Sequence, residues 1–553
     1  MDSGPCKLEQ TRCFQSHHYV VNREGLLNMN KHPNRLWIVV LLLGWICNFL
    51  FWGAGPGINF AAFVVVALLG GFGLLLANGY KPARNSLWLI APCLFFAGMS
   101  FIRQEPLSAF LAYTLTLVPM GIFAVTFLGG RWMEYGLPDY LFKAAQLVES
   151  LITGGSIFHS QVRREQAERG ETVTKWPIVP IVRGLLVALP ILAFFTALLA
   201  SADLVFNAKV TELFSGGKIG DYVRQLLVIL ICAYLLAGTL LHAALRSRDE
   251  KLLGQDKPVV RPFVGFAESA IVLGSVVILF SMFVIVQFQY FFGGNANIGI
   301  QGYTYSQYAR SGFNELVNVA FFSLLLILGL SSVTKRTEQL QQRIYSGLCV
   351  AMVALVLVIL ASAYQRLALA IDWHGFSRLR IYPRVFLIWV GILFVVVVVL
   401  ELLHRERYFA CAALLASLGF AISLSLLNVD DFIVRQNVLR AAQGQHFNPS
   451  YLGTLSIDAI PALADEFMDP SLPTPVHEGI GAALLCHQDS VAYRSALSLN
   501  TDWRSFHLAV WNAQRALAGA QNALAGYHVN KDKFIVRVRT PGNILYECVD
   551  TDQ

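Results

Sequence analysis

Three polar segments between long apolar runs carry most of the side chains that could do chemistry. Each segment combines arginine with carboxylate residues. Their ionisable residues are Arg310 and Glu315 in the first segment, Asp372, His374, Arg378, Arg380 and Arg384 in the second, and Asp430, Asp431 and Arg435 in the third. A guanidinium group forms two-point contacts with a carboxylate or a phosphate. These residues therefore predict either an ion-pair network that docks one part of the chain on another, or a site for an external anion such as a lipid phosphate.

Other catalytic and ligand-binding motifs are missing from the sequence. It has no Gly-x-x-x-x-Gly-Lys-[Ser/Thr] phosphate loop, no His-Glu-x-x-His zinc helix and no Gly-x-Ser-x-Gly nucleophile turn. His477 and Glu478 are followed by Gly-Ile-Gly, which breaks the zinc spacing, and the nine cysteines include no Cys-x-x-Cys pair. We therefore expect no catalytic residue, no bound metal, no cofactor and no nucleic-acid partner.

The elements that must position the polar segments are membrane-spanning helices. Of the 553 residues, 56% are hydrophobic and only 14% are charged, and the mean hydropathy is +0.55. Soluble domains carry about a quarter charged residues. Apolar runs long enough to cross a bilayer recur along the chain, so the sequence predicts a mainly α fold, a polytopic α-helical membrane bundle of about eleven spans. The spans lie near 36–52, 58–77, 87–102, 107–128, 178–200, 223–245, 263–288, 315–333, 344–367, 385–403 and 408–427.

The distribution of lysine and arginine predicts the orientation of these spans. About 23 basic residues lie in the N-terminal segment 1–35 and in every second connection, including 129–177, whereas about 6 lie in the other connections. Basic connections stay on the cytoplasmic side of a membrane. We expect a multi-pass protein of the bacterial inner (cytoplasmic) membrane, with a cytoplasmic N-terminus and, because the number of spans is odd, a periplasmic C-terminus. The polar first 35 residues argue against a cleaved signal peptide.

The long cytoplasmic connection 129–177 contains an amphipathic pattern. Leu141, Ala145, Val148 and Ile152 recur at spacings of three and four, so they share one face of a helix. We expect this helix to lie on the membrane surface.

A change in composition near Asn428 predicts a second, mostly helical domain over residues 428–553. This part of the chain has a net charge of about −4, while the rest carries about +11. Apolar residues spaced by three and four between Phe506 and Leu524 predict one buried helix face. Residues 534–538 and 544–549 predict a hairpin around a Pro-Gly turn. Cys486 and Cys548 both lie in this domain, where an oxidising compartment permits a disulfide if their positions meet.

Four motifs in and near the polar segments resemble a known family. They are Tyr-Ala-Arg-Ser-Gly-Phe-Asn-Glu-Leu at 308–316, Gly-Phe-Ser-Arg-Leu-Arg-Ile-Tyr-Pro at 375–383, Asn-Val-Asp-Asp at 428–431 with Asn437, and Tyr-Leu-Gly-Thr-Leu-Ser-Ile-Asp-Ala-Ile-Pro at 451–461. On these motifs the chain resembles a bacterial multi-span membrane family catalogued as a domain of unknown function (number four-one-seven-three), over about residues 178–467. The resemblance implies a bacterial membrane protein and supplies no activity, cofactor or catalytic residue.

Three classes of function remain. An exported domain joined to a membrane bundle favours a structural, sensory or regulatory envelope protein, with membrane lipids as partners and an envelope protein as partner of the exported domain. The outer arginines fit a transporter or facilitator of an anionic solute, although no predicted span has an ionisable residue near its middle. An enzyme acting on a lipid-linked substrate is disfavoured, because the first outer connection, 53–57, has no acidic residue. The sequence specifies no oligomeric state.

Overall fold

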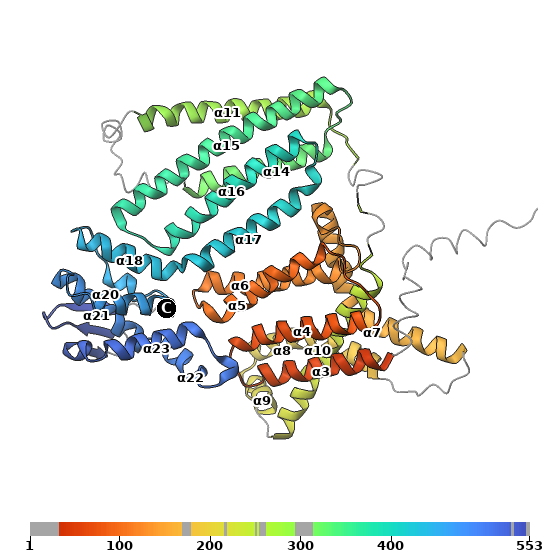
Figure 1. The fold of residues 1–553 in the computed structure, drawn as a ribbon, viewed down its shortest axis with the longest axis horizontal. Coiled ribbons are helices and arrows are strands. Elements are labelled where there is room, and N and C mark those ends of the chain that lie inside the picture. The colour runs from red at the N-terminus through yellow and green to blue at the C-terminus, as the bar shows by residue number, and fades with distance from the viewer. Residues whose placement is uncertain are drawn as a thin grey trace, which may run out of the picture.

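The computed structural model describes residues 33–168, 178–214, 218–248, 252–253, 261–292, 313–531 and 536–548. These residues form a mainly α-helical structure with long apolar helices, which confirms the predicted fold class (Figure 1). Arg310 and most of the predicted N-terminal segment 1–35 lie outside the described residues.

The first part of the chain forms a group of helices around one apolar core. Side chains of α3, α4, α6, α7 and α10 meet in this core, with Val40, Leu75 and Phe127 among its buried members. We call these helices and α5 the first helix group. The helices in this part of the chain are α3 (Pro33–Phe51), α4 (Ile58–Ala77), α5 (Ile90–Ile102), α6 (Pro106–Val125), α7 (Leu137–Glu168), α8 (Ile178–Ala202), α9 (Leu204–Phe214) and α10 (Lys218–Leu245).

The second helix group has its own core and touches the first group along one seam. Its core includes Met352, Phe394 and other apolar side chains that are closely packed between the helices. At the seam, Phe96 of α5 packs in one cluster with Leu418 of α17. The helices of this group are α11 (Phe266–Phe292), α14 (Phe313–Val333), α15 (Gln339–His374), α16 (Arg378–Leu402) and α17 (Phe409–Leu427).

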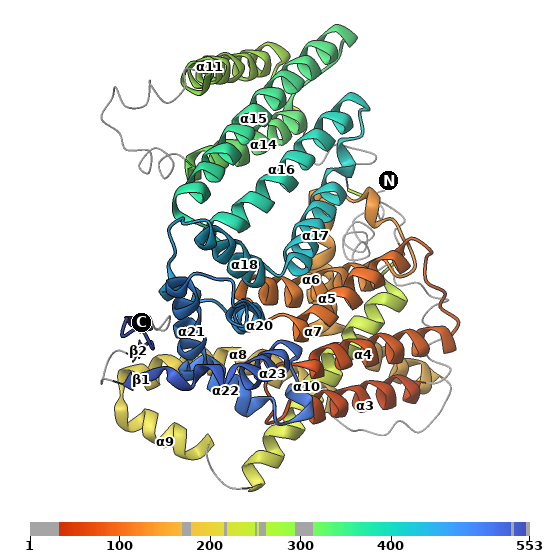
Figure 2. The ribbon, with the colours of Figure 1, turned by 60° about the vertical axis from the view of Figure 1, so that its left-hand side comes forward.

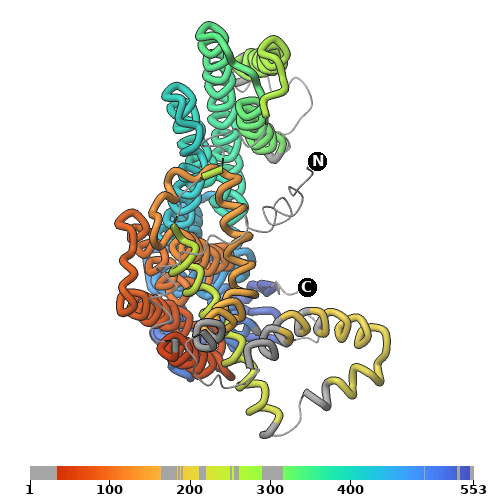
Figure 3. The backbone as a smooth tube through the Cα atoms, turned by 90° about the vertical axis from the view of Figure 1, so that its right-hand side faces the viewer, coloured from red at the N-terminus to blue at the C-terminus, as the bar shows by residue number. Residues whose placement is uncertain are grey.

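Helices occur at all eleven predicted spans. Among the described residues, nine helices are long and apolar enough to cross a membrane, and they coincide with nine of the predicted spans. The third predicted span coincides with a shorter apolar helical stretch, Ser86–Ile102. The fifth coincides with α8, which is not one of the nine; α8 contacts α7 and α10, and it projects to one side of the molecule together with α9 (Figure 3). A multi-pass membrane protein follows from these helices.

Alternate connections gather at two opposite ends of the helices. At one end, connections 52–57, 103–105 and 375–377 contact the C-terminal segment, residues 428–548; we call this the docking end. At the other end, Gly129 N–H donates to the Ser247 carbonyl and Phe263 N–H to the Val333 carbonyl. This alternation agrees with the two sets of connections that the lysine and arginine pattern distinguishes.

Helix α7, expected on the membrane surface, is held against α10 by small residues. A Cβ atom on Gly238 of α10 would lie 2.5 Å from the Ser150 carbonyl oxygen, so only glycine permits this approach. Ser150 also bonds His242 at 2.8 Å. The apolar residues predicted to share one face of α7 are all exposed, and Leu141 is 74% exposed. An exposed apolar face of this kind suits contact with lipid.

The C-terminal segment lies across the docking end of both helix groups (Figures 1 and 2). Its core reaches into the bundle, because Ile381 of α16 and Leu424 of α17 belong to the same buried cluster as Ile460 and Leu484. Its helices are α18 (Val429–Ala442), α19 (Pro449–Leu452), α20 (Ile460–Phe467), α21 (Thr474–Asp489), α22 (Val491–Leu499) and α23 (Leu508–Ala520).

The C-terminal segment ends in a small antiparallel sheet. Helix α23 buries Ala513 and Leu517, as the spacing predicted. Strands β2 (Val536–Arg539) and β3 (Leu545–Cys548) form the predicted hairpin, and β1 (His528–Lys531), which the sequence did not predict, pairs with β2. Cys486 and Cys548 form a disulfide with a Cα–Cα distance of 5.4 Å, which joins β3 to α21.

Candidate functional site

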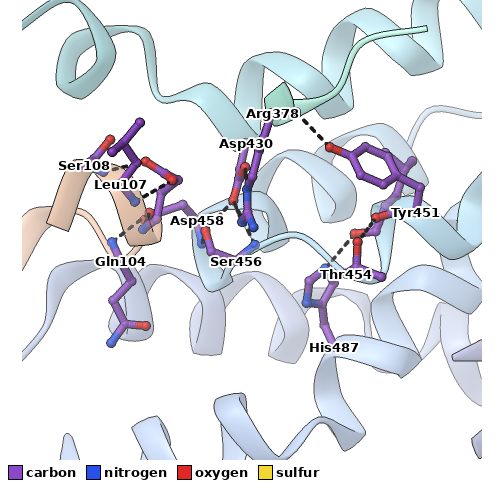
Figure 4. Close-up of polar contacts among 12 residues, drawn as sticks. Gln104, Leu107, Ser108, Arg378, Asp430, Tyr451, Thr454, Ser456, Asp458 and His487 are labelled. Carbon is purple, nitrogen blue, oxygen red and sulfur yellow. Dashed lines mark hydrogen bonds and ion pairs between the residues drawn. The ribbon is translucent and has the colours of Figure 1, made fainter. Parts of the chain in front are cut away.

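The second and third polar segments meet where the C-terminal segment docks on the helices (Figure 4). The chain passes from α17 into α18 through Asn428, whose φ of 50° is left-handed, a conformation that asparagine tolerates better than most residues. Because of this turn, α18 begins at Val429, and only Asn428 separates it from the end of α17 at Leu427. Asp430 therefore lies in the first turn of α18, directly below the start of α16, where Arg378 is the first helical residue.

Arg378 and Asp430 form the centre of this contact. The Arg378 Nε and Nη2 atoms donate to the two Asp430 carboxylate oxygens at 2.8 Å and 2.5 Å. Asp430 is fully buried, whereas the Arg378 side chain is 23% exposed. Such fork-shaped pairs are the strongest and most directional of the protein ion pairs.

Asp430 has little capacity left for a further ligand. Besides Arg378, the Ser456 N–H and hydroxyl donate to its Oδ2 at 2.8 Å and 2.5 Å. A carboxylate has about four lone-pair positions, and this one accepts four hydrogen bonds. The Tyr451 hydroxyl accepts the Arg378 N–H at 3.0 Å, so the same part of the C-terminal segment also fixes the backbone of α16. The geometry is that of a joint between two parts of the chain.

A second contact joins the C-terminal segment to the first helix group. Asp458 Oδ2 accepts the backbone N–H groups of Gln104 and Glu105, each at 2.7 Å. Glu105 caps α6 by accepting from the N–H groups of Leu107 and Ser108, and it also accepts from the Tyr382 hydroxyl of α16. Burial raises the pKa of Asp458 to about 6, although the hydrogen bonds from Gln104 and Glu105 oppose the increase.

Two further contacts lie on either side of these carboxylates. The Arg504 Nη1 donates to the carbonyl oxygens of Phe49 and Trp52 at the end of α3, at 2.7 Å and 3.1 Å. The Asn437 side chain exchanges two hydrogen bonds with the backbone of Phe376, at 2.8 Å and 2.9 Å. A Cβ atom on Gly375 would lie 2.6 Å from Asn437 Oδ1, and Gly375 has a φ of +77°, so glycine is needed there on both counts.

Buried histidines support the same region from within the C-terminal segment. His487 donates through Nε2 to the Leu452 carbonyl at 2.9 Å, and burial lowers its pKa to about 4. His507 is also buried, which lowers its pKa to about 4 as well. Both rings are therefore neutral near pH 7. Among the described residues, no three His, Cys, Asp or Glu side chains gather as a metal site would require.

The other predicted site residues are distributed around this centre. Arg380 donates to the Gly375 carbonyl at 2.8 Å, and Arg384 donates to the Tyr364 hydroxyl and stacks on its ring. Asp431 pairs with Arg435, which also binds Asp465 at 3.0 Å. Asp372 accepts a hydrogen bond from Arg440 through its backbone carbonyl only, and the side chains of Asp372, His374 and Glu315 are exposed. The structure therefore joins Arg378 to Asp430 and leaves most of the other predicted residues in separate contacts.

Four important residues of this interface were not predicted from the sequence as site residues. They are Glu105, Ser456, Asp458 and Arg504. Glu105 precedes Pro106, and an acidic residue before a proline is a common start of a helix, so its capping role could have been found. Ser456 and Asp458 lie in one of the four motifs quoted for the family, but no sequence pattern pairs Ser456 with Asp430, or Asp458 with Gln104 and Glu105, which lie more than 300 positions away.

Comparison with known proteins gives a family and no function. Neither a search of curated proteins nor a search of solved structures finds a match. The family that matches is described as a domain of unknown function, DUF4153, so the number four-one-seven-three expected from the motifs is wrong. The match begins earlier than expected and includes Arg378, Asp430, Glu105 and Asp458. By this match over residues 38–466, the chain belongs to the DUF4153 family.

Proposed function

We propose that this chain is an integral protein of the bacterial inner membrane with a structural, sensory or regulatory role in the envelope. In this proposal the N-terminus is cytoplasmic, and residues 428–553 form a periplasmic domain that docks on the outer face of the bundle. Membrane lipids surround the helices, and an envelope protein is the expected partner of the exported domain.

The main support is the two-point pair of Arg378 and Asp430, which Ser456 also binds. An anion site needs cationic donors that are free to bind a ligand, whereas Arg378 donates to Asp430 and Asp430 has its remaining positions filled by Ser456. Burying such a pair is costly unless its carboxylate is well hydrogen-bonded, and Asp430 accepts four hydrogen bonds from Arg378 and Ser456. The arrangement favours docking over binding of an anionic solute.

The sidedness rests on the basic residues and agrees with the cysteines. About 23 of the Lys and Arg residues outside the C-terminal segment belong to the N-terminal segment and to every second connection after it, against about 6 in the other connections. The Cys486–Cys548 disulfide lies on the side that this pattern assigns to the periplasm, where disulfides persist.

Reporter insertions test the proposed orientation. The turn at Gly444, between α18 and α19, is exposed and can accept an inserted protein. Alkaline phosphatase inserted there should be active and green fluorescent protein dark, and the reverse is expected for insertion at Lys81, in a connection at the opposite end. An inactive phosphatase and a fluorescent protein at Gly444 would overturn the proposed topology.

A further inference from the structure

A cavity of about 460 Å³ lies at the end of the helices opposite the docking end. We call it the basal cavity. Its walls are mainly apolar and come from Ile327 and Leu328 of α14, Val397 and Leu400 of α16, and Phe409 of α17. Hydrocarbon satisfies such walls, because it brings no polar group that would need a partner.

Charged residues at the rim of the basal cavity are largely paired with each other. Arg336 binds the buried Glu401 at 3.2 Å and stacks on Tyr345, with its guanidinium 4.2 Å from the ring centre. Arg407 binds Asp139 at 3.4 Å. These two pairs leave the side chains of Arg336 and Arg407 only 12% and 30% exposed.

A second cavity of about 660 Å³ adjoins the first and is lined by an exposed lysine and a partly exposed carboxylate. The two cavities share Pro262 and Glu406. Lys335 lines the second cavity, is exposed and makes no ion pair with any other residue that the structure describes. The Glu406 side chain is 41% exposed, and its one ion pair in the described part of the chain is with Arg336, at 3.5 Å. One cation and one carboxylate thus face the same space beside an apolar cavity.

We infer that these two cavities bind one molecule of a zwitterionic glycerophospholipid with a primary ammonium group, phosphatidylethanolamine. An acyl chain occupies the basal cavity, the lipid phosphate contacts Lys335, and the ammonium contacts Glu406. The six charged groups around the two cavities, Asp139, Lys335, Arg336, Glu401, Glu406 and Arg407, sum to zero. A head group with both signs of charge complements them better than phosphatidylglycerol, which would bring a negative charge for Lys335 and no cation for the exposed part of Glu406.

Retention of lipid by the purified full-length protein tests this inference. The protein is reconstituted in vesicles that contain equal amounts of phosphatidylethanolamine and phosphatidylglycerol, extracted in mild detergent, and analysed by native mass spectrometry. We expect one phosphatidylethanolamine to remain bound in preference to phosphatidylglycerol. Soluble glycerophosphoethanolamine, which has the same head group without acyl chains, should not displace it.

Three variants test which residues contact the bound lipid. Lys335→Gln and Glu406→Gln should each lower the retained phosphatidylethanolamine about tenfold, which corresponds to the loss of one charge-assisted contact. Leu328→Trp, which fills the basal cavity, should remove it. Lys81→Gln and Glu338→Gln are matched controls, because both residues are exposed at the same end but outside the two cavities, and they should retain lipid like the wild type.

Two results would overturn the inference. One is equal retention of the two lipids by the wild type. The other is unchanged retention in Lys335→Gln and Glu406→Gln variants whose circular dichroism and melting temperature match those of the wild type. Displacement by glycerophosphoethanolamine alone would show a head-group site without an acyl site and would also contradict the inference.

Discussion

Substitution of Arg378 by glutamine should release the C-terminal segment from the helices. The change removes the donors at 2.8 Å and 2.5 Å and leaves the fully buried Asp430 carboxylate with Ser456 alone. Breaking a buried pair by removing one partner costs about 3 to 5 kcal/mol, which raises the undocked population by roughly two to three and a half orders of magnitude. Cleavage by protease follows this population when opening is faster than cleavage, so the C-terminal segment should be cut far faster.

The assay is limited proteolysis of the detergent-solubilised protein, together with its melting temperature. Arg494→Gln is the matched control, because Arg494 lies in the same segment, is 57% exposed and contacts Asp489 at only 3.9 Å, so it should change little. Exchange of the charges in an Arg378→Asp, Asp430→Arg double variant should restore part of the loss. Normal protease resistance in Arg378→Gln would refute the docking argument. So would stabilisation of the wild type by an anion at a hundredfold excess, about 2.7 kcal/mol, that this variant abolishes.

Three other predictions concern the C-terminal segment. Because burial raises the pKa of Asp458 from 3.8 to about 6, the folded state holds its proton more tightly, and docking should weaken as the pH rises through about 6, by up to about 3 kcal/mol. Asp458→Asn should flatten that pH dependence of protease protection. Burial lowers the pKa of His487 from 6.5 to about 4, so its contribution to stability is complete above pH 6.5 and is lost as the pH falls toward 4; His487→Gln should reduce this acid sensitivity in melting curves. Replacing Cys486 and Cys548 by serine opens a loop with a sequence separation of 62 and should destabilise the segment by about 4 kcal/mol relative to the oxidised wild type, measured by denaturant unfolding, and the reduced wild type should behave like the variant.

The positions of the spans could be predicted because hydropathy is a local property. An apolar run such as 58–77 has few other structures available to it in a bilayer, and it forms α4 over that range. The buried face of α23 follows in the same way from the spacing of Ala509, Ala513 and Leu517. The four residues of β1, His-Val-Asn-Lys, carry no alternation of buried and exposed positions, so that strand depends on its pairing with β2.

The docking interface could be predicted only in part. Arginines on the side where the charge pattern disfavours them pointed to Arg378, and the available carboxylates included Asp430. The choice among those carboxylates was open, because it depends on the left-handed turn at Asn428 and on how α18 then packs against α16. The contact of Asp458 with Gln104 and Glu105 joins residues about 350 positions apart and has no signal in the sequence near either of them.

The C-terminal segment has a mechanical consequence for the two helix groups. It holds the second group through Arg378 and Asn437, and the first group through Asp458 and Arg504. Transporters that work by alternating access rock one helix bundle against another around a central site. Here, opening the docking end by such rocking would have to break hydrogen bonds on both groups at the same time. The docked C-terminal segment therefore fixes the position of the two helix groups relative to each other.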